Sequence, residues 1–144
     1  MSVIQQLRQG ITTDSAEQTR AIAKEFAQIL PAEVTLALHG DMGVGKTTFV
    51  QGLAEGLGVT ERVTSPTFAI FSVHRGSRHS LIHLDAYRLE NEHQIESLLL
   101  EDFLISPYCL AVEWPEKIAA WLPNDTWHLT LSIENGDCHR LLLR

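Results

Sequence analysis

Residues 34–58 read VTLALHGDMGVGKTTFVQGLAEGLG, and this stretch decides the fold. Its first six residues form a short, nearly continuous apolar run, which is typical of a strand buried on both faces of a parallel sheet. A glycine-rich turn follows. The pattern from Lys46 to Leu57 then predicts a helix, and Gly58 stands where a glycine commonly ends one. We therefore expect a strand, a turn and a helix in immediate succession.

The turn from Gly40 to Thr47 matches the P-loop pattern GxxxxGK[ST] at every fixed position. Its glycines can adopt backbone angles that aim successive N–H groups inward and create a concave anion site. The following helix adds its dipole and its free N–H groups. Lys46 would face the β- and γ-phosphates, and the Thr47 hydroxyl would ligate magnesium. A surface glycine turn is the alternative, but the strand and helix around it favour a bound nucleoside triphosphate with magnesium.

Two carboxylates each follow an apolar run, as acidic groups at the ends of buried strands should. Asp85 ends the run Leu81–Leu84, and Glu113 ends the run Cys109–Val112. Ligands of open α/β sheets bind at the carboxyl ends of the strands, so both acids are candidates for holding magnesium and orienting the attacking water. We favour the longer Glu113 as the metal ligand and Asp85 as a metal-shell or water-orienting group. His83 should share the strand face of Asp85.

The remaining segments alternate between strand and helix patterns. In chain order they predict a helix over 14–30 opened by a capping box of Asp14 and Glu17, strands over 68–73 and 80–84 in a hairpin, a helix over 92–103, a strand over 108–112, a short helix over 115–122, and strands over 127–133 and 139–143 around an Asn135-Gly136 turn. This order predicts one domain over residues 1–144. We expect a three-layer fold of the P-loop NTPase type: a mostly parallel central sheet, added antiparallel hairpin strands, and helices on both faces.

Composition limits where and on what the protein acts. The formal net charge is −7, and no cluster of Lys and Arg marks a surface for nucleic acid. Cys109 lies in an apolar run and is expected to be a buried, reduced thiol. We find neither a signal peptide nor an apolar run near the roughly 20 residues of a membrane span, so we expect a cytoplasmic protein.

Four motifs occur in order and at fitting distances: GDMGVGKTTF, TSPTF, HLDAYRL and VEWPE. Together they resemble the TsaE (formerly YjeE) family, the bacterial ATPases of tRNA threonylcarbamoyladenosine synthesis. The resemblance spans nearly the whole chain. GKTT alone is generic, whereas SPTF combined with HxDxYR and EW is specific to this family.

The resemblance implies ATP and magnesium as cofactors and a set of site residues. The nucleotide-binding residues would be Thr13 and Ser15 near the base, together with Asp41, Met42, Gly43, Val44, Gly45, Lys46, Thr47 and Thr48. Thr47, Asp85 and Glu113 would serve the metal, and the two acids would be catalytic. Residues 65–68 correspond to a switch-like loop.

The resemblance also implies partners. Members of the family act with a TsaB–TsaD heterodimer, which transfers the threonylcarbamoyl group onto the adenosine next to the anticodon of ANN-decoding tRNAs. The ATPase is thought to reset that complex between turnovers. Contact with tRNA would be indirect, which agrees with the acidic charge balance.

Three rivals share the P-loop. A small-molecule kinase would need a lid and an acceptor pocket, and the chain has no obvious Arg-rich lid segment. A regulatory GTPase should carry an NKxD-type guanine motif, and none is present. A sensor that binds nucleotide without hydrolysing it would retain partner function when the acids are removed.

Overall fold

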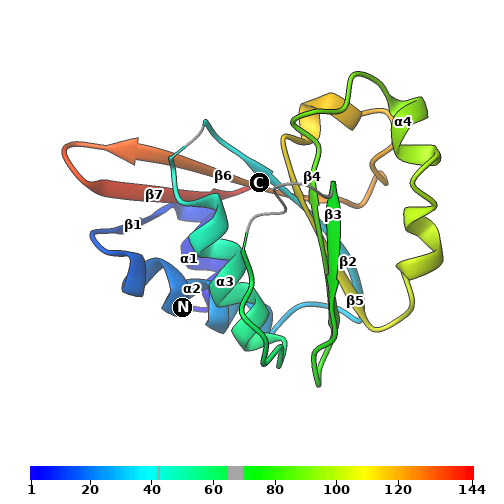
Figure 1. Ribbon diagram of the computed structural model, residues 1–144. Coiled ribbons are helices and arrows are strands. Elements are labelled where there is room, and N and C mark those ends of the chain that lie inside the picture. Colours follow the sequence, from blue (N-terminus) through cyan, green and yellow to red (C-terminus); the bar gives the residue numbers. More distant parts are fainter. Residues whose placement is uncertain (42, 65–69) are drawn as a thin grey trace.

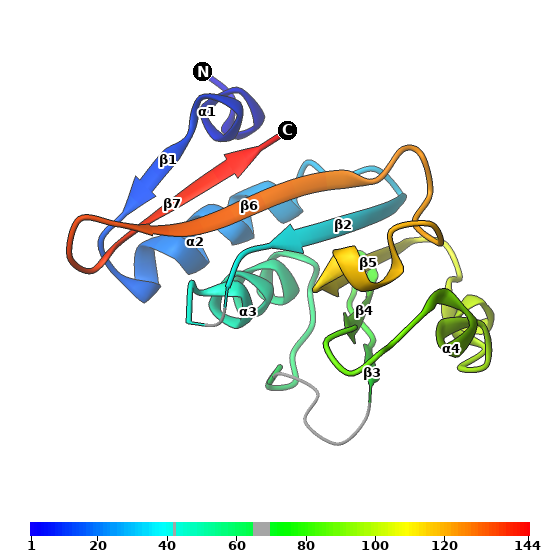
Figure 2. The same cartoon turned by 90° about the horizontal axis from the view of Figure 1, so that it is seen from above.

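A seven-stranded sheet forms the centre of the computed structural model, which describes residues 1–41, 43–64 and 70–144 (Figures 1 and 2). The strands are β1 (Ile11–Thr13), β2 (Glu33–His39), β3 (Phe71–His74), β4 (Ser80–Asp85), β5 (Tyr108–Glu113), β6 (Trp127–Glu134) and β7 (Cys138–Leu143). Across the sheet they stand in the order β1-β7-β6-β2-β5-β4-β3. The middle strands β6, β2, β5 and β4 are parallel, and the pairings β1–β7, β6–β7 and β3–β4 are antiparallel. The expected mixed sheet with a parallel centre is therefore confirmed.

Helices pack on both faces of the sheet and create two hydrophobic cores. They are α1 (Val3–Gln9), α2 (Ala16–Ala27), α3 (Lys46–Gly56), α4 (Glu92–Glu96) and the 3-10 helices η1 (Leu100–Phe103) and η2 (Pro115–Ile118). The larger core lies under α1, α2 and α3, and the smaller one under α4, η1 and η2. Figure 1 shows α3 and α4 on opposite sides of β4 and β5.

Strand β5 shows why this sequence produces two cores. Cys109 and Ala111 face the larger core, while Leu110 and Val112 face the smaller one, and all four are fully buried. Successive side chains of a strand point to opposite faces, so a continuous apolar run is the pattern that a strand covered on both sides requires.

Three helix predictions need correction. The helix expected over 14–30 begins after Ser15, whose Oγ accepts a hydrogen bond from the Gln18 backbone N at 3.1 Å. The capping box of Asp14 and Glu17 is therefore wrong by one residue, and the helix ends at Ala27. The helix expected over 92–103 is interrupted, because Leu99 adopts left-handed backbone angles with φ of 54°. The one expected over 115–122 is only the 3-10 helix η2.

Two N-terminal elements were not predicted. Helix α1 begins with a capping box in which the Ser2 side chain accepts from the Gln5 backbone and the Gln5 side chain accepts from the Ser2 backbone. Helix α1 packs against β7 (Figure 2), and β1 adds to the same strand as the sheet edge. The Ser-x-x-Gln spacing was the available sequence signal.

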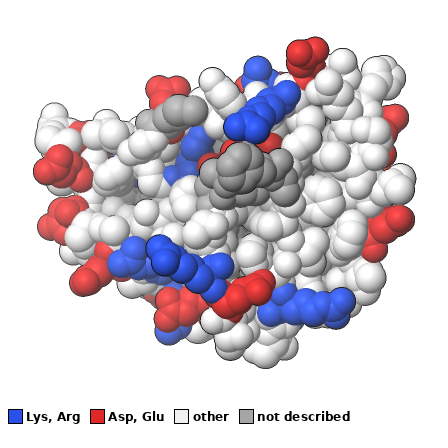
Figure 3. Space-filling view, in the orientation of Figure 1, with Lys and Arg blue, Asp and Glu red and all other residues white. Residues whose placement is uncertain are grey.

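The cysteines and the charged side chains can be compared with what the sequence predicted for them. Cys109 and Cys138 are free thiols, and complete burial raises the pKa of Cys109 to about 12, which confirms a buried reduced thiol. On the face shown in Figure 3, Lys and Arg side chains stand in small separate groups among acidic ones. No helix in the described part of the chain combines the length and apolarity needed to cross a membrane.

Candidate functional site

The turn between β2 and α3 contains three glycines with positive φ, a backbone conformation that other residues rarely adopt. Gly40, Gly43 and Gly45 have φ angles of 144°, 80° and 96°. A Cβ on Gly40 would lie 2.5 Å from the Leu131 carbonyl oxygen, so this glycine lets the turn pass close to β6. Gly45 stands at the N-cap of α3, and no side chain of residues 1–41, 43–64 or 70–144 caps the helix there. The first N–H groups of α3 therefore remain available to an anion.

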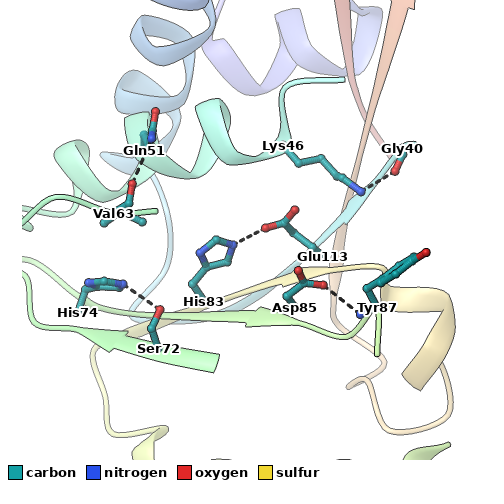
Figure 4. A network of polar contacts seen from close by, with 10 residues as sticks. All are labelled: Gly40, Lys46, Gln51, Val63, Ser72, His74, His83, Asp85, Tyr87 and Glu113. Atoms are coloured by element: carbon teal, nitrogen blue, oxygen red, sulfur yellow. Dashed lines mark hydrogen bonds and ion pairs between the residues drawn. The ribbon is translucent and has the colours of Figure 1, made fainter. Parts of the chain in front are cut away.

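Lys46 is held beside this turn in a nearly buried position. Its side chain is only 6% exposed, and Nζ donates a hydrogen bond to the Gly40 carbonyl oxygen at 2.6 Å (Figure 4). Nζ also lies 4.0 Å from the centre of the Trp114 ring. Burial lowers the pKa of Lys46, and the negative charges of Glu113, Glu116, Asp85 and Asp41 oppose this shift. The ammonium is thus a desolvated cation surrounded by acidic groups.

The two predicted carboxylates meet at the same edge of the sheet. Asp85 is the last residue of β4 and Glu113 the last of β5, and they are partners in the parallel register. The Asp85 Oδ1 accepts a hydrogen bond from the Tyr87 backbone N at 3.0 Å. Glu113 is buried, with 5% of its surface exposed. Both acids thus lie at the carboxyl ends of their strands and line one cavity with the glycine turn, while their roles toward metal and water stay predictions.

That cavity has a volume of about 400 Å³. It is lined by Gly43, Gly45, Lys46, Thr47, Thr48, Asp85, Glu113 and Trp114. The predicted residues thus come together from a turn, a helix and two strand ends. Trp114 follows Glu113 directly in the sequence and has left-handed backbone angles with φ of 58°.

Other predicted residues lie outside the cavity lining. Thr13 is buried, and its hydroxyl is 2.7 Å from the Thr19 hydroxyl, while Ser15 caps α2. Asp41 is exposed, and Val44 packs into the larger core. Contact of these residues with a nucleotide stays a prediction. Met42 and the proposed switch segment 65–68 lie outside the described residues.

Two histidines support the site in ways that the sequence did not reveal. The Nε2 atom of His83 lies 2.5 Å from the Glu113 Oε2 (Figure 4). The sequence did place His83 on the face of Asp85, but it gave no sign of this contact. His139 of β7 donates from Nδ1 to the Val44 carbonyl oxygen at 2.9 Å. Only the fold brings His139 to the turn, since 95 residues separate the two partners.

The site can hold an anion and a hard cation together. Helix N–H groups and a buried ammonium attract negative charge, and the Thr47 hydroxyl with two carboxylates offers oxygen ligands of the kind that Mg²⁺ prefers. Fold and site together define a mixed α/β protein with a candidate anion site at the carboxyl ends of its parallel strands.

The chain belongs to the TsaE family. The family model described as "Threonylcarbamoyl adenosine biosynthesis protein TsaE" matches residues 13–141. The chain is 38% identical over 125 residues to the tRNA threonylcarbamoyladenosine biosynthesis protein TsaE of Bacillus subtilis, which covers 87% of this chain and 78% of the relative. It is 32% identical to the protein of the same name from Rickettsia bellii, with 93% of each chain covered.

A solved structure agrees with this assignment. The crystal structure of Bacillus subtilis YdiB superposes with a TM-score of 0.75 at 34% sequence identity. The match covers 92% of this chain and 81% of YdiB. The predicted family is therefore confirmed.

Proposed function

We propose that this protein binds ATP with magnesium in the cavity between the glycine turn and the two carboxylates, and hydrolyses the ATP slowly when alone. The observation that carries the proposal is Lys46, a buried ammonium held by the Gly40 carbonyl beside an uncapped helix N-terminus. Burying this cation is costly, and a triphosphate would add charge-assisted hydrogen bonds to the one that the Gly40 carbonyl supplies.

The cavity residues take distinct roles in this proposal. Thr47 and Glu113 hold the magnesium ion, whose chemistry is to neutralise charge on the phosphate oxygens. Asp85, fixed by the Tyr87 backbone N, orients the attacking water. Lys46 leaves the Gly40 carbonyl to contact the β- and γ-phosphates. Trp114 covers the lysine and restricts access of bulk water to it.

The hydrolysis supports formation of the threonylcarbamoyl group on the adenosine next to the anticodon of ANN-decoding tRNAs. The names of the relatives indicate this pathway. We propose that the protein acts in the cytoplasm on a TsaB–TsaD heterodimer and resets it between turnovers. With a formal net charge of −7, the chain is poorly suited to hold tRNA itself, and it meets the tRNA only through the complex.

Calorimetry with Lys46→Ala tests nucleotide binding. The variant loses charge-assisted phosphate bonds that contribute about 1.5–3 kcal/mol each, so we expect no ATP binding at cellular concentrations. Lys117→Ala is the matched control, because Lys117 is an exposed lysine whose Nζ stands 6.0 Å from the Tyr87 ring centre, outside the cavity lining. Equal ATP affinity of wild type and Lys46→Ala would refute the proposal.

Analysis of the reaction products distinguishes an ATPase from a small-molecule kinase. We expect slow release of free phosphate, faster when TsaB–TsaD is added, and weak competition by GTP. A phosphorylated small-molecule acceptor would instead support the kinase alternative.

Asp85→Asn and Glu113→Gln should abolish phosphate release and the stimulation of tRNA modification together. Full stimulation without hydrolysis would identify a nucleotide sensor.

A further inference from the structure

We infer that His83 is a positioning residue that fixes the Glu113 carboxylate for its work on the metal-bound nucleotide. The inference rests on the proposed function, because it assigns Glu113 a task in that site. In this inference, His83 holds the Oε2 atom of Glu113, and the other oxygen, Oε1, thereby stays available to the cavity.

The placement of the two residues is set by the parallel register. His83 pairs with Ala111, and Glu113 follows Ala111 by two residues on the neighbouring strand. The two side chains therefore stand diagonally on one face of the sheet, the face toward α3 (Figure 4). Their contact joins Nε2 and Oε2 at 2.5 Å.

Charge and hydrogen bonding fix the direction of this contact. An ionised carboxylate only accepts hydrogen bonds, so the proton lies on Nε2 and His83 donates to Oε2. Within the described residues, Glu113 has no other side-chain hydrogen bond, and Oε1 remains for the cavity that Glu113 lines. Asp85 differs, since a backbone N–H holds one of its oxygens.

A purely structural role explains His83 poorly. The side chain is fully buried on the face of β4 opposite to that of Ile82 and Leu84, and within the described residues its Nδ1 has no hydrogen-bond partner. Burying an imidazole with an unpaired nitrogen costs more than burying an aliphatic side chain of similar size. Among the residues that the structure describes, its one compensating hydrogen bond is to Glu113, so the benefit of a histidine here lies in the carboxylate that it holds.

Substitutions at His83 separate the effect of losing the hydrogen-bond donor from the effect of changing the side-chain volume. His83→Leu keeps the volume and removes the donor, whereas His83→Gln keeps an amide N–H at a similar reach. We expect His83→Leu to bind ATP in EDTA as the wild type does, to need about ten-fold more Mg²⁺ for half-maximal hydrolysis and to lose about ten-fold in kcat. His83→Gln should recover most of both losses.

His79→Leu is the matched control. His79 is also buried, and its Nδ1 has no partner in the described part of the chain, but its Nε2 donates to the Pro31 carbonyl oxygen at 2.8 Å, away from the cavity. Its loss should lower Tm without changing the Mg²⁺ requirement. If His83→Leu does not fold, His83→Asn takes its place, because the shorter amide does not reach Glu113.

A second readout needs neither nucleotide nor metal. Long-range ¹H–¹⁵N correlation spectra of the metal-free protein should show His83 as the Nε2–H tautomer, and this signature should change in Glu113→Ala. Wild-type protein that neither binds nor hydrolyses ATP would overturn the proposed function and the inference with it. Active wild type with an equally active His83→Leu, at the same Mg²⁺ requirement, would overturn the inference alone.

Discussion

The glycines of the turn meet two different physical demands. Gly40 has no room for a side chain, since a Cβ there would collide with the Leu131 carbonyl oxygen. Gly43 has φ of 80°, and no described atom lies within 4 Å of the position that its Cβ would occupy. Gly40 is thus required by packing against β6, whereas Gly43 is required by its backbone angles and by the open cavity beside it.

Gly43→Ala should weaken ATP binding far more than it weakens the fold. A left-handed alanine costs about 1–2 kcal/mol of stability, and its methyl group would occupy space beside the phosphates. We expect ATP affinity to fall by at least about ten-fold, or about 1.4 kcal/mol, in calorimetry.

Gly136→Ala is the matched control for this change. Gly136 lies in the β6–β7 turn with φ of 73°, and its Cβ would also meet no described atom within 4 Å. Both variants should lose similar stability in thermal melts, and only Gly43→Ala should lose ATP affinity. Equal affinities for the two variants would show that the cavity beside Gly43 does not receive the nucleotide.

Helices α2 and α3 approach each other closely through glycines of α3. A Cβ on Gly52 would stand 2.4 Å from the Arg20 carbonyl oxygen, and one on Gly56 would stand 2.5 Å from the Lys24 carbonyl oxygen. This contact orients α3, and the N-terminus of α3 carries Lys46 and Thr47 into the cavity.

Gly52→Ala should therefore destabilise the protein, although alanine favours a helix by about 1 kcal/mol over glycine. The overpacking against backbone atoms typically costs about 1–3 kcal/mol and exceeds that gain. Urea unfolding should show a lower midpoint for Gly52→Ala. Glu55→Ala on the same helix removes only the exposed ion pair with Lys24 and should change stability by about 1 kcal/mol or less. A stabilised Gly52→Ala would contradict the packing argument.

At the level of elements, the sequence predicted best where one physical pattern dominated. The apolar runs ending in His39, Asp85 and Glu113 are buried on both faces, so each strand and its terminal group were predictable. The prediction of one helix over 92–103 was wrong. Its apolar residues fit a helical pattern, but Leu99 is 64% exposed and has left-handed backbone angles. The strand β1 is too short for a periodic pattern and is held by pairing with β7.

The whole molecule contributes contacts that no local pattern contains. The glycine turn follows β2, the carboxylates end β4 and β5, and the C-terminal hairpin of β6 and β7 supports the turn from the other side. His83 and His139 meet their hydrogen-bond partners only when the strands have paired into the sheet. Motif spacing predicted the cavity lining, and tertiary packing supplied the residues that hold it in place.

His139 tests whether the hairpin holds the turn in its binding shape. His139→Phe removes the Nδ1 donor to the Val44 carbonyl oxygen, and one such hydrogen bond contributes about 0.5–1.5 kcal/mol. If the turn is organised for nucleotide by this contact, ATP affinity should fall by roughly two- to twelve-fold. His139→Asn, whose amide nitrogen stands near the place of Nδ1, should retain most of the affinity. Arg140→Gln alters the adjacent position of β7, whose side chain reaches Gln9 instead of the turn, and should bind ATP as the wild type does. A loss of the same size in Arg140→Gln would trace the effect to the hairpin as a whole and would contradict a specific tether at His139.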